Sequence, residues 1–387
     1  MKKSLIGIFG ALLASQVFAG GIDAKTNLNA GYIRNPSRNT ESERPEAALY
    51  NIAGTAFMAD GLYLEAGNQF IFKTYSHEAA GTEYKDEKPV FLFPNAEIVY
   101  KHGKLGFFGT FQVAAGGGSL EYKDGSAAVG GGLLKPIDIY SVTFGQNLGA
   151  SFAINDKVSL SGAVRLLEAS QSMETKHPVY GKLGYEASGF GIGGIFGVNW
   201  RPVENLDLAF QYKTVTKTEC EIDSTKGPAA VIATFGIVDG KKYDADLSPE
   251  FNFGAGYKID NLYLSSSFNY YFNGQADMGS ALSDTNADYD DSWEIYGGAD
   301  YKINEKFLVS GGIGYSKQGF NDEYNNVFSP VLDCVSFGLG GEITPVKALT
   351  VAFGGMYAKY LEEEYNSLTL NKSIIMLGLS ATYKFGL

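Results

Sequence analysis

Residues 154–166 read INDKVSLSGAVRL, a short polar turn followed by an alternation of two kinds of side chain. Apolar residues take one parity, while small or polar residues, together with Arg165, take the other. A period of two indicates a β-strand, because successive side chains of a strand point to opposite faces of the sheet. The pattern returns in LYLSSSFNYYF (residues 262–272) and FLVSGGIGY (residues 307–315). The chain from Gly61 onward is therefore predicted to be all-β.

The breaks between these segments come in two lengths that alternate strictly along the chain. An antiparallel meander does this when its two ends face different surroundings. Seven long loops and six short turns require fourteen strands, and an even strand number with sorted loops is typical of outer-membrane barrels. The short turns lie at His102, Ile154, Arg201, Lys258, Lys302 and Thr344, and the long breaks cover residues 76–87, 119–137, 172–185, 220–246, 274–289, 319–331 and 361–371.

The prediction is a 14-stranded antiparallel transmembrane β-barrel over residues 61–387. Lipid offers backbone groups no hydrogen-bond partner, so only helices or closed barrels span it. The apolar parity would face lipid and the polar parity the lumen, with Trp200 and Trp293 near strand ends where aromatic girdles lie. The last strand follows the same rule from Ile375 to Leu387. The alternative, a secreted β-sandwich, has no reason to sort its loops by length.

The first residues, MKKSLIGIFGALLASQVFAG, have the charged start, apolar run and small-residue cleavage site of a signal peptide, predicted over residues 1–19. A transmembrane anchor is the alternative, but the apolar run is short. Loss of Lys2 and Lys3 takes the net charge from −12 to −14, which argues against a nucleic-acid partner. Cys220 and Cys334 could pair in an oxidising compartment, although spacing alone does not decide it.

Residues 20–60 carry Arg34, Arg38 and Arg44 and show no sustained alternation. A segment that precedes the first strand on the periplasmic side can fold back into the lumen as a plug. The alternative is a disordered periplasmic tail, but the stretch ALYNIAGTAF (residues 48–57) is more apolar than such tails are. An N-terminal plug is therefore predicted.

The chain resembles a known family in AGYIRNPSRNTESERPEAALYNIAGTAFMADGLYLEAGNQF, PNAEIVYKHGKLGFFGTF, GIFGVNWRPVENLDLAFQYKT and YDADLSPEFNFGAGYKIDNLYLSSSFNYYFN. These stretches look like FadL-type outer-membrane transporters of long-chain fatty acids, whose architecture is fourteen strands and an N-terminal plug. The plug of that family carries an Asn-Pro-Ala signature that packs near the third strand. The matching positions are Asn51, Ile52 and Ala53, followed by Gly54, so isoleucine replaces a proline whose fixed φ is lost.

The resemblance implies three functional regions. Outer loops would capture the ligand, and the apolar run GPAAVIATFGIVDG (residues 227–240) would form one wall of that site, unless it is a hairpin that extends the barrel. A second apolar loop, SAAVGGGLLKPIDIY, follows the third strand. The run AAGGG ends that strand, and its glycines suit a bulge that opens a lateral gate, or else a simple strand end. The capture candidates are Val231, Ile232, Phe235, Ile237 and Val238, and the gate candidates are Gly116, Gly117 and Gly118.

Arg165 is the candidate partner for a carboxylate head group, because it has the inward parity and a buried carboxylate binds best to a cation. The alternative is an arginine in a salt network with acids of the plug. DTNADYDD (residues 284–291) has the alternating acids of a calcium loop, but Tyr289 stands where such a loop needs glycine, so a solvated acidic loop is expected. His77, His102 and His177 lie in no metal motif, and no catalytic serine motif occurs.

The sequence therefore predicts an outer-membrane protein that takes up long-chain fatty acids or other hydrophobic compounds, without cofactor or enzymatic activity, and as a monomer in outer-membrane lipid. A hydrophobic tunnel admits aromatic hydrocarbons as readily as acyl chains. Two other classes remain open. A general porin would have a charged, water-filled lumen, and a surface adhesin or antigen would depend on its loops alone.

Overall fold

The computed structural model describes residues 28–386 except 130, 131, 282, 288, 320–324 and 326. The predicted signal peptide, the first residues of the predicted plug and Leu387 lie outside this part of the chain. Within it, no helix is both long and apolar enough to cross a membrane.

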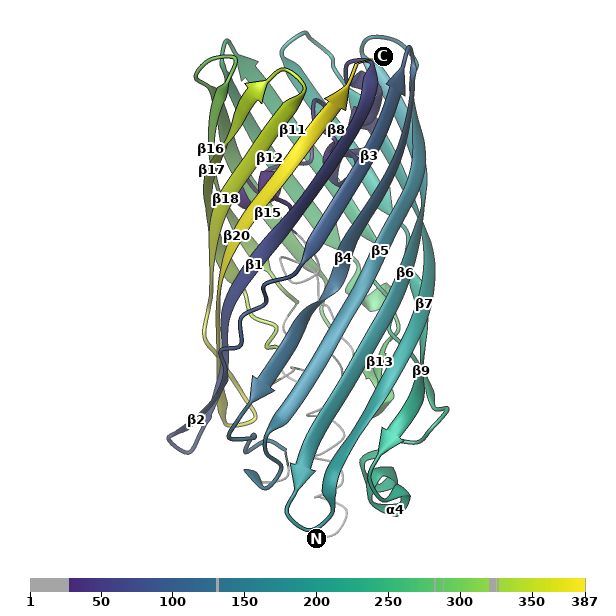
Figure 1. Cartoon of the computed structure of the whole chain (residues 1–387), viewed down its shortest axis with the longest axis vertical. Coiled ribbons are helices and arrows are strands. Elements are labelled where there is room, and N and C mark those ends of the chain that lie inside the picture. Colours follow the sequence, from purple (N-terminus) through teal and green to yellow (C-terminus); the bar gives the residue numbers. More distant parts are fainter. Residues whose placement is uncertain are drawn as a thin grey trace.

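The strands form a closed antiparallel barrel of fourteen, as predicted (Figure 1). Four of these are each built from two pieces, namely β2 with β3, β8 with β9, β10 with β11, and β18 with β19. A hairpin of β13 (Met278–Ser280) and β14 (Ser283–Ala287) forms a separate two-stranded sheet that is not part of the wall. The wall strands are β1 (Gly61–Ala79), β2 (Thr82–Asp86), β3 (Pro94–His102), β4 (Leu105–Tyr122), β5 (Ile137–Ala153), β6 (Val158–His177), β7 (Gly181–Trp200), β8 (Leu206–Lys213), β9 (Lys217–Lys226), β10 (Lys242–Asp244), β11 (Glu250–Ile259), β12 (Leu262–Tyr271), β15 (Ser292–Lys302), β16 (Phe307–Lys317), β17 (Cys334–Val346), β18 (Leu349–Tyr360), β19 (Glu363–Tyr365) and β20 (Leu368–Phe385).

The first and last strands close the sheet on itself. β1 pairs with β20 in unbroken antiparallel register from Leu62 opposite Phe385 to Glu78 opposite Thr369. Closure satisfies the backbone groups that a sheet edge would leave unpaired, which is what a lipid environment requires.

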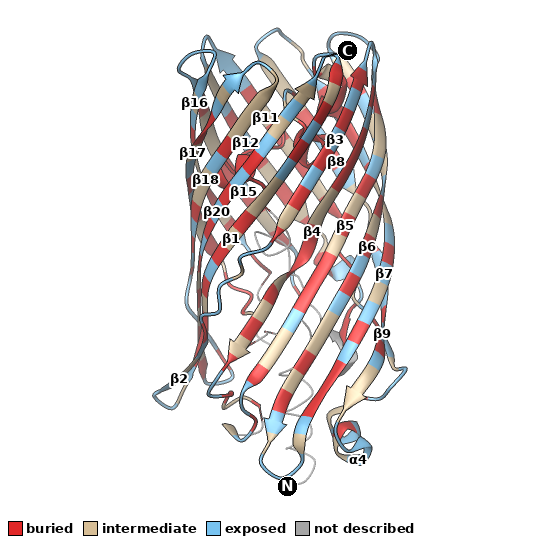
Figure 2. Ribbon diagram, in the orientation of Figure 1, coloured by how far each residue is buried: buried red, intermediate tan, exposed pale blue. Residues whose placement is uncertain are grey.

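The two faces of the wall separate as the parity predicted. Figure 2 shows buried and exposed residues alternating along β5, β6 and β7. In β6, Leu160 and Val164 are exposed on the outside, while Ser159 and Arg165 are buried on the inside. Exposed aromatic side chains gather near the short turns, where an interfacial girdle is expected. They include Tyr100, Phe107, Phe152, Trp200, Tyr257, Tyr301, Phe307 and Tyr383.

Several predicted long loops are strands instead. β6 runs to His177 and β7 begins at Gly181, so the predicted break over residues 172–185 is wrong in its bounds. Likewise β1 continues to Ala79 and turns directly into β2. The outward side chains of β6 turn polar at Glu168 and Ser170, which ends the lipid-facing alternation, but the backbone ladder to β7 continues because it does not depend on lipid. Loss of alternation therefore marked the membrane boundary and not the end of the strand.

The two cysteines are buried, on β9 and β17 respectively, and neither is in a disulfide, so the pairing that the composition left open is not formed. In the acidic stretch near Asp284, residues 283–287 belong to β14. Across the described residues, no group of His, Cys, Asp or Glu side chains could hold a metal ion.

Short helices occur at both ends of the barrel. Inside the wall, at the end of the short turns, lie α2 (Ala30–Arg34), α3 (Ala47–Tyr50) and the 3-10 helix η1 (Ile52–Phe57), drawn in purple in Figure 1. Asn29 caps α2, because its side-chain oxygen accepts a hydrogen bond from the amide of Tyr32 at 2.9 Å. At the other end lie α4 (Ala229–Ile232) and the 3-10 helices η3 (Ala233–Phe235) and η4 (Asn273–Gln275).

Candidate functional site: the plugged lumen

Residues 28–60, which we call the plug, sit against the inner wall, and glycines make room for them. A Cβ atom on Gly338 of β17 would lie 2.4 Å from the carbonyl oxygen of Ile33 in α2, and one on Gly354 of β18 would lie 2.8 Å from the amide nitrogen of Arg34. Any side chain at these positions would push α2 away. The inward glycines of β17 and β18 are therefore the seat of the plug, a signal that the sequence held but that the parity argument did not use.

A cluster of seven charged residues joins the plug to this side of the wall; we call it the plug ion cluster. Its acids on the wall are Asp300 of β15 and Glu342 of β17. Arg34 contacts both, with its guanidinium 3.3 Å from Asp300 and 2.6 Å from Glu342, and it also donates to Ser310. The cluster consists of Arg34, Arg38, Glu41, Arg44, Glu46, Asp300 and Glu342.

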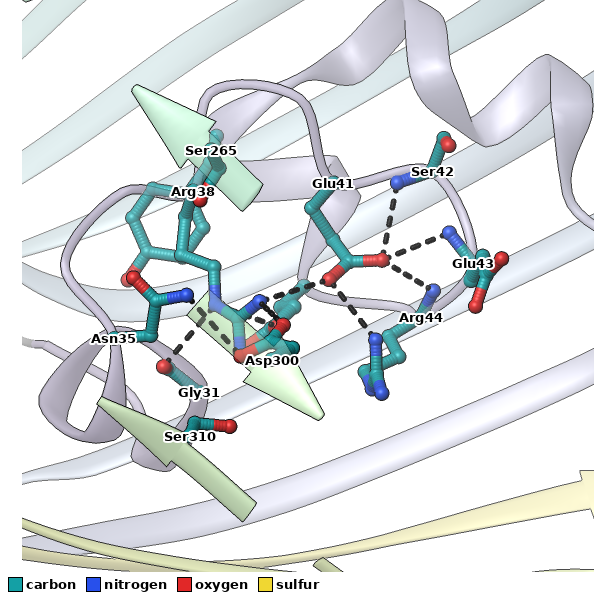
Figure 3. Close-up of polar contacts among 12 residues, drawn as sticks. Gly31, Asn35, Arg38, Glu41, Ser42, Glu43, Arg44, Ser265, Asp300 and Ser310 are labelled. Carbon is teal, nitrogen blue, oxygen red and sulfur yellow. Dashed lines mark hydrogen bonds and ion pairs between the residues drawn. The ribbon is translucent and has the colours of Figure 1, made fainter. Parts of the chain in front are cut away.

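Arg38 holds the centre of this cluster, as Figure 3 shows. Its Nη1 lies 2.8 Å from Asp300, and its Nε donates to the carbonyl of Gly31 at 3.1 Å. Arg44 reaches Glu342 at 2.5 Å and Glu41 at 3.3 Å. Buried charges need partners of this kind, because an unpaired charge in a low-dielectric interior is costly.

Two carboxylates of the plug ion cluster, Glu41 and Glu46, have pKa values shifted in opposite directions. Burial alone would raise the pKa of Glu41, but Arg44 and Arg38 outweigh burial and lower it. Glu46 differs, because burial raises its pKa to about 8 and Arg38, 3.4 Å away, offsets this only in part. One oxygen of Glu46 also has no hydrogen-bond partner. Glu46 is therefore the group of the plug that changes charge near neutral pH.

The predicted plug motif, Asn51 to Gly54, docks on the wall opposite α2. Asn51 donates to Asn199 of β7 at 2.6 Å, and its side-chain oxygen caps η1 by accepting from the amide of Gly54 at 3.1 Å. The carbonyl of Ala53 accepts from Ser159 of β6 at 2.7 Å. A Cβ on Gly54 would lie 2.4 Å from the carbonyl oxygen of Glu41, so only glycine fits there.

The contacts of Ile52 give a reason for isoleucine in place of the family's proline. Its backbone amide donates to the side-chain oxygen of Gln211 on β8 at 3.1 Å. Proline has no amide hydrogen and could not make this bond. The departure from the family signature thus adds a contact between the plug and the wall.

Arg165 lies on the inner face of β6 and is 6% exposed. Its backbone pairs with β5 and β7, but within the described part of the chain its guanidinium makes no hydrogen bond and no ion pair, so the predicted alternative of a salt network with plug acids is not realised. Glu250 on β11 attracts it, but the carboxylate of Glu250 is held by Lys213 at 2.5 Å. Two residues further along β6, Leu167 packs in a buried apolar cluster with Ala114, Ala115 and Leu247.

The apolar loop of residues 227–240 folds on the outer rim as α4 and η3 (Figure 1). Ile232 and Ile237 are buried, Val231 and Phe235 are partly buried against the apolar core, and Val238 is exposed. Four of the five candidate side chains therefore pack at least partly against the apolar core and Val238 remains exposed, while the segment forms short helices and not the hairpin of the alternative.

The glycine run on β4 bends the strand. Gly116 and Gly118 have φ of 93° and 75°, values that suit glycine, and the pairing of β4 with β5 shifts register between Val113 and Gly118. The predicted bulge is therefore present at Gly116–Gly118.

Two polar cavities flank the plug at the end of the short turns. One of about 210 Å³ is lined by charged groups that include Arg201, Asp207 and Lys258. The other, of about 230 Å³, is lined among others by Glu65 and Lys384. Both are polar surroundings for a hydrophobic molecule.

Comparison with solved structures gives the same architecture. A FadL homologue of Pseudomonas aeruginosa matches with a TM-score of 0.74 and 15% identity, over 96% of this chain and 100% of that one. This chain has the FadL-type barrel fold. The toluene transporters TodX of Pseudomonas putida (TM-score 0.70, 16% identity, 96% and 100% covered) and TbuX of Ralstonia pickettii (0.65, 15%, 95% and 99%) also match. The lipid-facing band and this fold indicate the outer membrane of a Gram-negative bacterium.

No family model matches the sequence, and comparison with curated proteins finds no match. The resemblance seen in the sequence is thus confirmed at the level of the fold. What sequence reasoning missed are the wall partners of the plug arginines, Asp300 and Glu342. Both have the inward parity of their strands, but so do Glu65, Glu97, Glu250 and Glu294, so parity alone could not single them out.

Proposed function

We propose that this barrel takes up hydrophobic compounds that carry an acidic head group, with long-chain fatty acids as the leading class. The observation that carries the proposal is Arg165, a buried cation in the lumen that is left without a hydrogen-bond or ion-pair partner among the described residues. A carboxylate would supply both the charge and the hydrogen bonds it lacks.

The apolar surroundings support this ligand class. The lumen beyond Arg165, toward the long loops, holds a large buried apolar cluster that includes Ile71, Tyr122 and Phe328. Each CH₂ group moved from water into such surroundings gains about 0.8 kcal/mol. Capture at the outer rim, where Val238 is exposed, would precede this step.

The free energy of transferring CH₂ groups also favours a lateral exit into the membrane. The cavities beside the plug are lined by charged groups, so an acyl chain that passed them would lose the gain it had made. Leu167 links Arg165 to Ala114 and Ala115, which directly precede the glycine bulge on β4. The proposed route therefore runs from Arg165 to that bulge and out into the membrane.

The test is ligand binding by purified protein in detergent. Oleate and oleyl alcohol share a chain and differ in the head group, so Arg165→Gln is expected to weaken oleate binding by about 10- to 100-fold, the worth of a charge-assisted bond, and to leave oleyl alcohol unchanged. Lys176→Gln, an exposed cation on the same strand, is the matched control and should change neither. Equal loss for both ligands would show that Arg165 is structural.

Neutral aromatic compounds are the second candidate, since neighbours of this fold are toluene transporters and the lumen holds an aromatic pair, Tyr122 and Phe328, with ring centroids 5.0 Å apart. Toluene that competes with oleyl alcohol, but binds equally to wild type and Arg165→Gln, would favour this reading over an acidic ligand.

A further inference from the structure

The barrel wall is interrupted between its second and third strands. Residues 87–93, which join β2 to β3, follow β1: the amide of Gln69 donates to the carbonyl of Phe93 at 3.1 Å, and that of Ile71 to Val90 at 2.8 Å. On the other side, the β3–β4 ladder ends at Ala96 opposite Phe111. Among the described residues, no backbone hydrogen bond joins residues 87–93 to residues 112–118 of β4. Here the wall is held by side chains alone.

Two side chains fill this interruption. A Cβ on Gly118 would lie 3.2 Å from a methyl carbon of Val90 and 3.5 Å from the ring of Phe93. Phe93 is 1% exposed, whereas Phe91 and Leu92 are 59% and 75% exposed on the lipid side. The side chains thus change from the lipid side at Leu92 to the inside at Phe93, and the Phe93 ring lies beside the glycine bulge.

The backbone of Phe93 is held by hydrogen bonds, whereas its side chain lies beside a glycine of β4. Its amide donates to the side-chain oxygen of Asn68 at 2.8 Å, and its carbonyl accepts from Gln69. Across from the ring stands Gly118 of the bulge, which has no side chain to interlock with it. Rotation of the Phe93 side chain would therefore open the wall without breaking any backbone bond.

A buried ion pair fixes the outer end of the interruption. The ammonium of Lys73 on β1 lies 2.9 Å from Asp86 of β2 and donates to the carbonyl of Ser119 on β4 at 2.7 Å. Asp86 in turn accepts from the amide of Glu121 on β4 at 2.7 Å. Both charged side chains are buried. Three strands are joined here, just past the end of the interruption, so the pair and the β3–β4 ladder set its two limits.

We propose that Phe93, backed by Val90, is the size-selective gate of the lateral exit, and that the Lys73–Asp86 pair is a positioning element that fixes the rim. This rests on the proposed function. The gate admits slender, unbranched acyl chains when the Phe93 ring turns aside. It holds back hydrophobic compounds that carry fused rings.

The experiment compares uptake of palmitate and 12-(1-pyrenyl)dodecanoate by cells that carry each variant. Both compounds have a carboxylate, so head-group binding cancels in the ratio. Phe93→Ala is expected to raise pyrenyl uptake relative to palmitate about five-fold or more, because the ring that narrows the exit is gone. Phe91→Ala removes the same ring from the lipid side and is expected to leave the ratio unchanged.

Binding of the pyrenyl acid to purified protein, measured by its fluorescence, separates the gate from the proposed function. Binding that Phe93→Ala leaves intact, together with a changed uptake ratio, supports the gate. An unchanged ratio with intact binding overturns the gate alone. If the wild type binds neither compound, the proposed function fails and the gate with it.

The rim is tested with Lys73→Met combined with Asp86→Leu, which removes both charges and so leaves no lone charge buried. Folding is checked by gel electrophoresis, in which a closed barrel migrates more slowly after heating than before. The folded double variant is expected to raise the pyrenyl ratio above wild type. A ratio equal to wild type would refute a role of the pair in positioning the rim. If the double variant does not fold, Lys73→Arg, which keeps the charge but alters its geometry, is measured in its place by the same criterion.

Discussion

Asp300 is the wall residue on which plug docking depends most directly, and Asp300→Asn tests this. Its carboxylate accepts from Arg38 at 2.8 Å, from Arg34 at 3.3 Å and from Asn35 at 3.1 Å. Asparagine keeps the shape but removes the charge that two buried arginines face. Breaking a buried pair in this way costs about 3–5 kcal/mol. Since about 1.4 kcal/mol is a factor of ten, docking of the plug should weaken by about two to three and a half orders of magnitude.

Hydrogen exchange in detergent measures this opening. The amides of Ile33 and Asn35 donate within α2, to Asn29 and Gly31, and are protected only while the plug is docked. Their protection is expected to fall by about 100- to 4000-fold in Asp300→Asn, while the strands keep theirs. Asp156→Asn, in an exposed short turn, is the control. If α2 keeps its protection although the variant barrel is folded, the plug is not held by the ion cluster.

The remaining predictions concern pH, packing and thiols. Burial raises the pKa of Glu46 to about 8, so the docked plug favours the protonated carboxyl, and docking should weaken as pH rises from about 4.5 through 8. Hydrogen exchange of α2, corrected for intrinsic rates, should show this pH dependence in the wild type and not in Glu46→Gln. Gly338→Ala places a Cβ against the backbone of α2 and should lower plug protection, whereas Gly355→Ala, with its nearest contact at 3.4 Å, should not. Titration of the unfolded, unreduced protein should find two free thiols, from Cys220 and Cys334, and a result of none would contradict the structure.

The wall of the barrel could be predicted from sequence because one rule, alternation, acts on every membrane-spanning residue. It placed Leu160 and Val164 outside and Arg165 inside, as the structure has them. It did not place the strand ends, since the ladder beyond the membrane needs only backbone pairing. The hairpin of β6 and β7 was for that reason predicted as a loop.

The plug could be predicted as a segment but not in its contacts. Arg34, Arg38 and Arg44 were visible as charges without partners, and their partners on β15 and β17 depend on barrel register, which alternation does not give. The same holds for Ile52, whose replacement of proline has meaning only once Gln211 is known to stand opposite its amide. The sequence could not show whether the apolar loop of residues 227–240 is exposed or packed, because residues such as Ile232 suit a binding surface and a packed surface equally well.

Uptake of radiolabelled oleate by whole cells shows whether this barrel carries long-chain fatty acids. Cells that lack their own long-chain fatty acid uptake would carry wild-type protein, Arg165→Ala or no protein, with a small sugar as the control for an open pore. We expect the wild type to restore oleate uptake, Arg165→Ala to reduce it about ten-fold or more, and neither to admit the sugar. Sugar entry without oleate uptake would refute fatty acid transport and indicate a general porin.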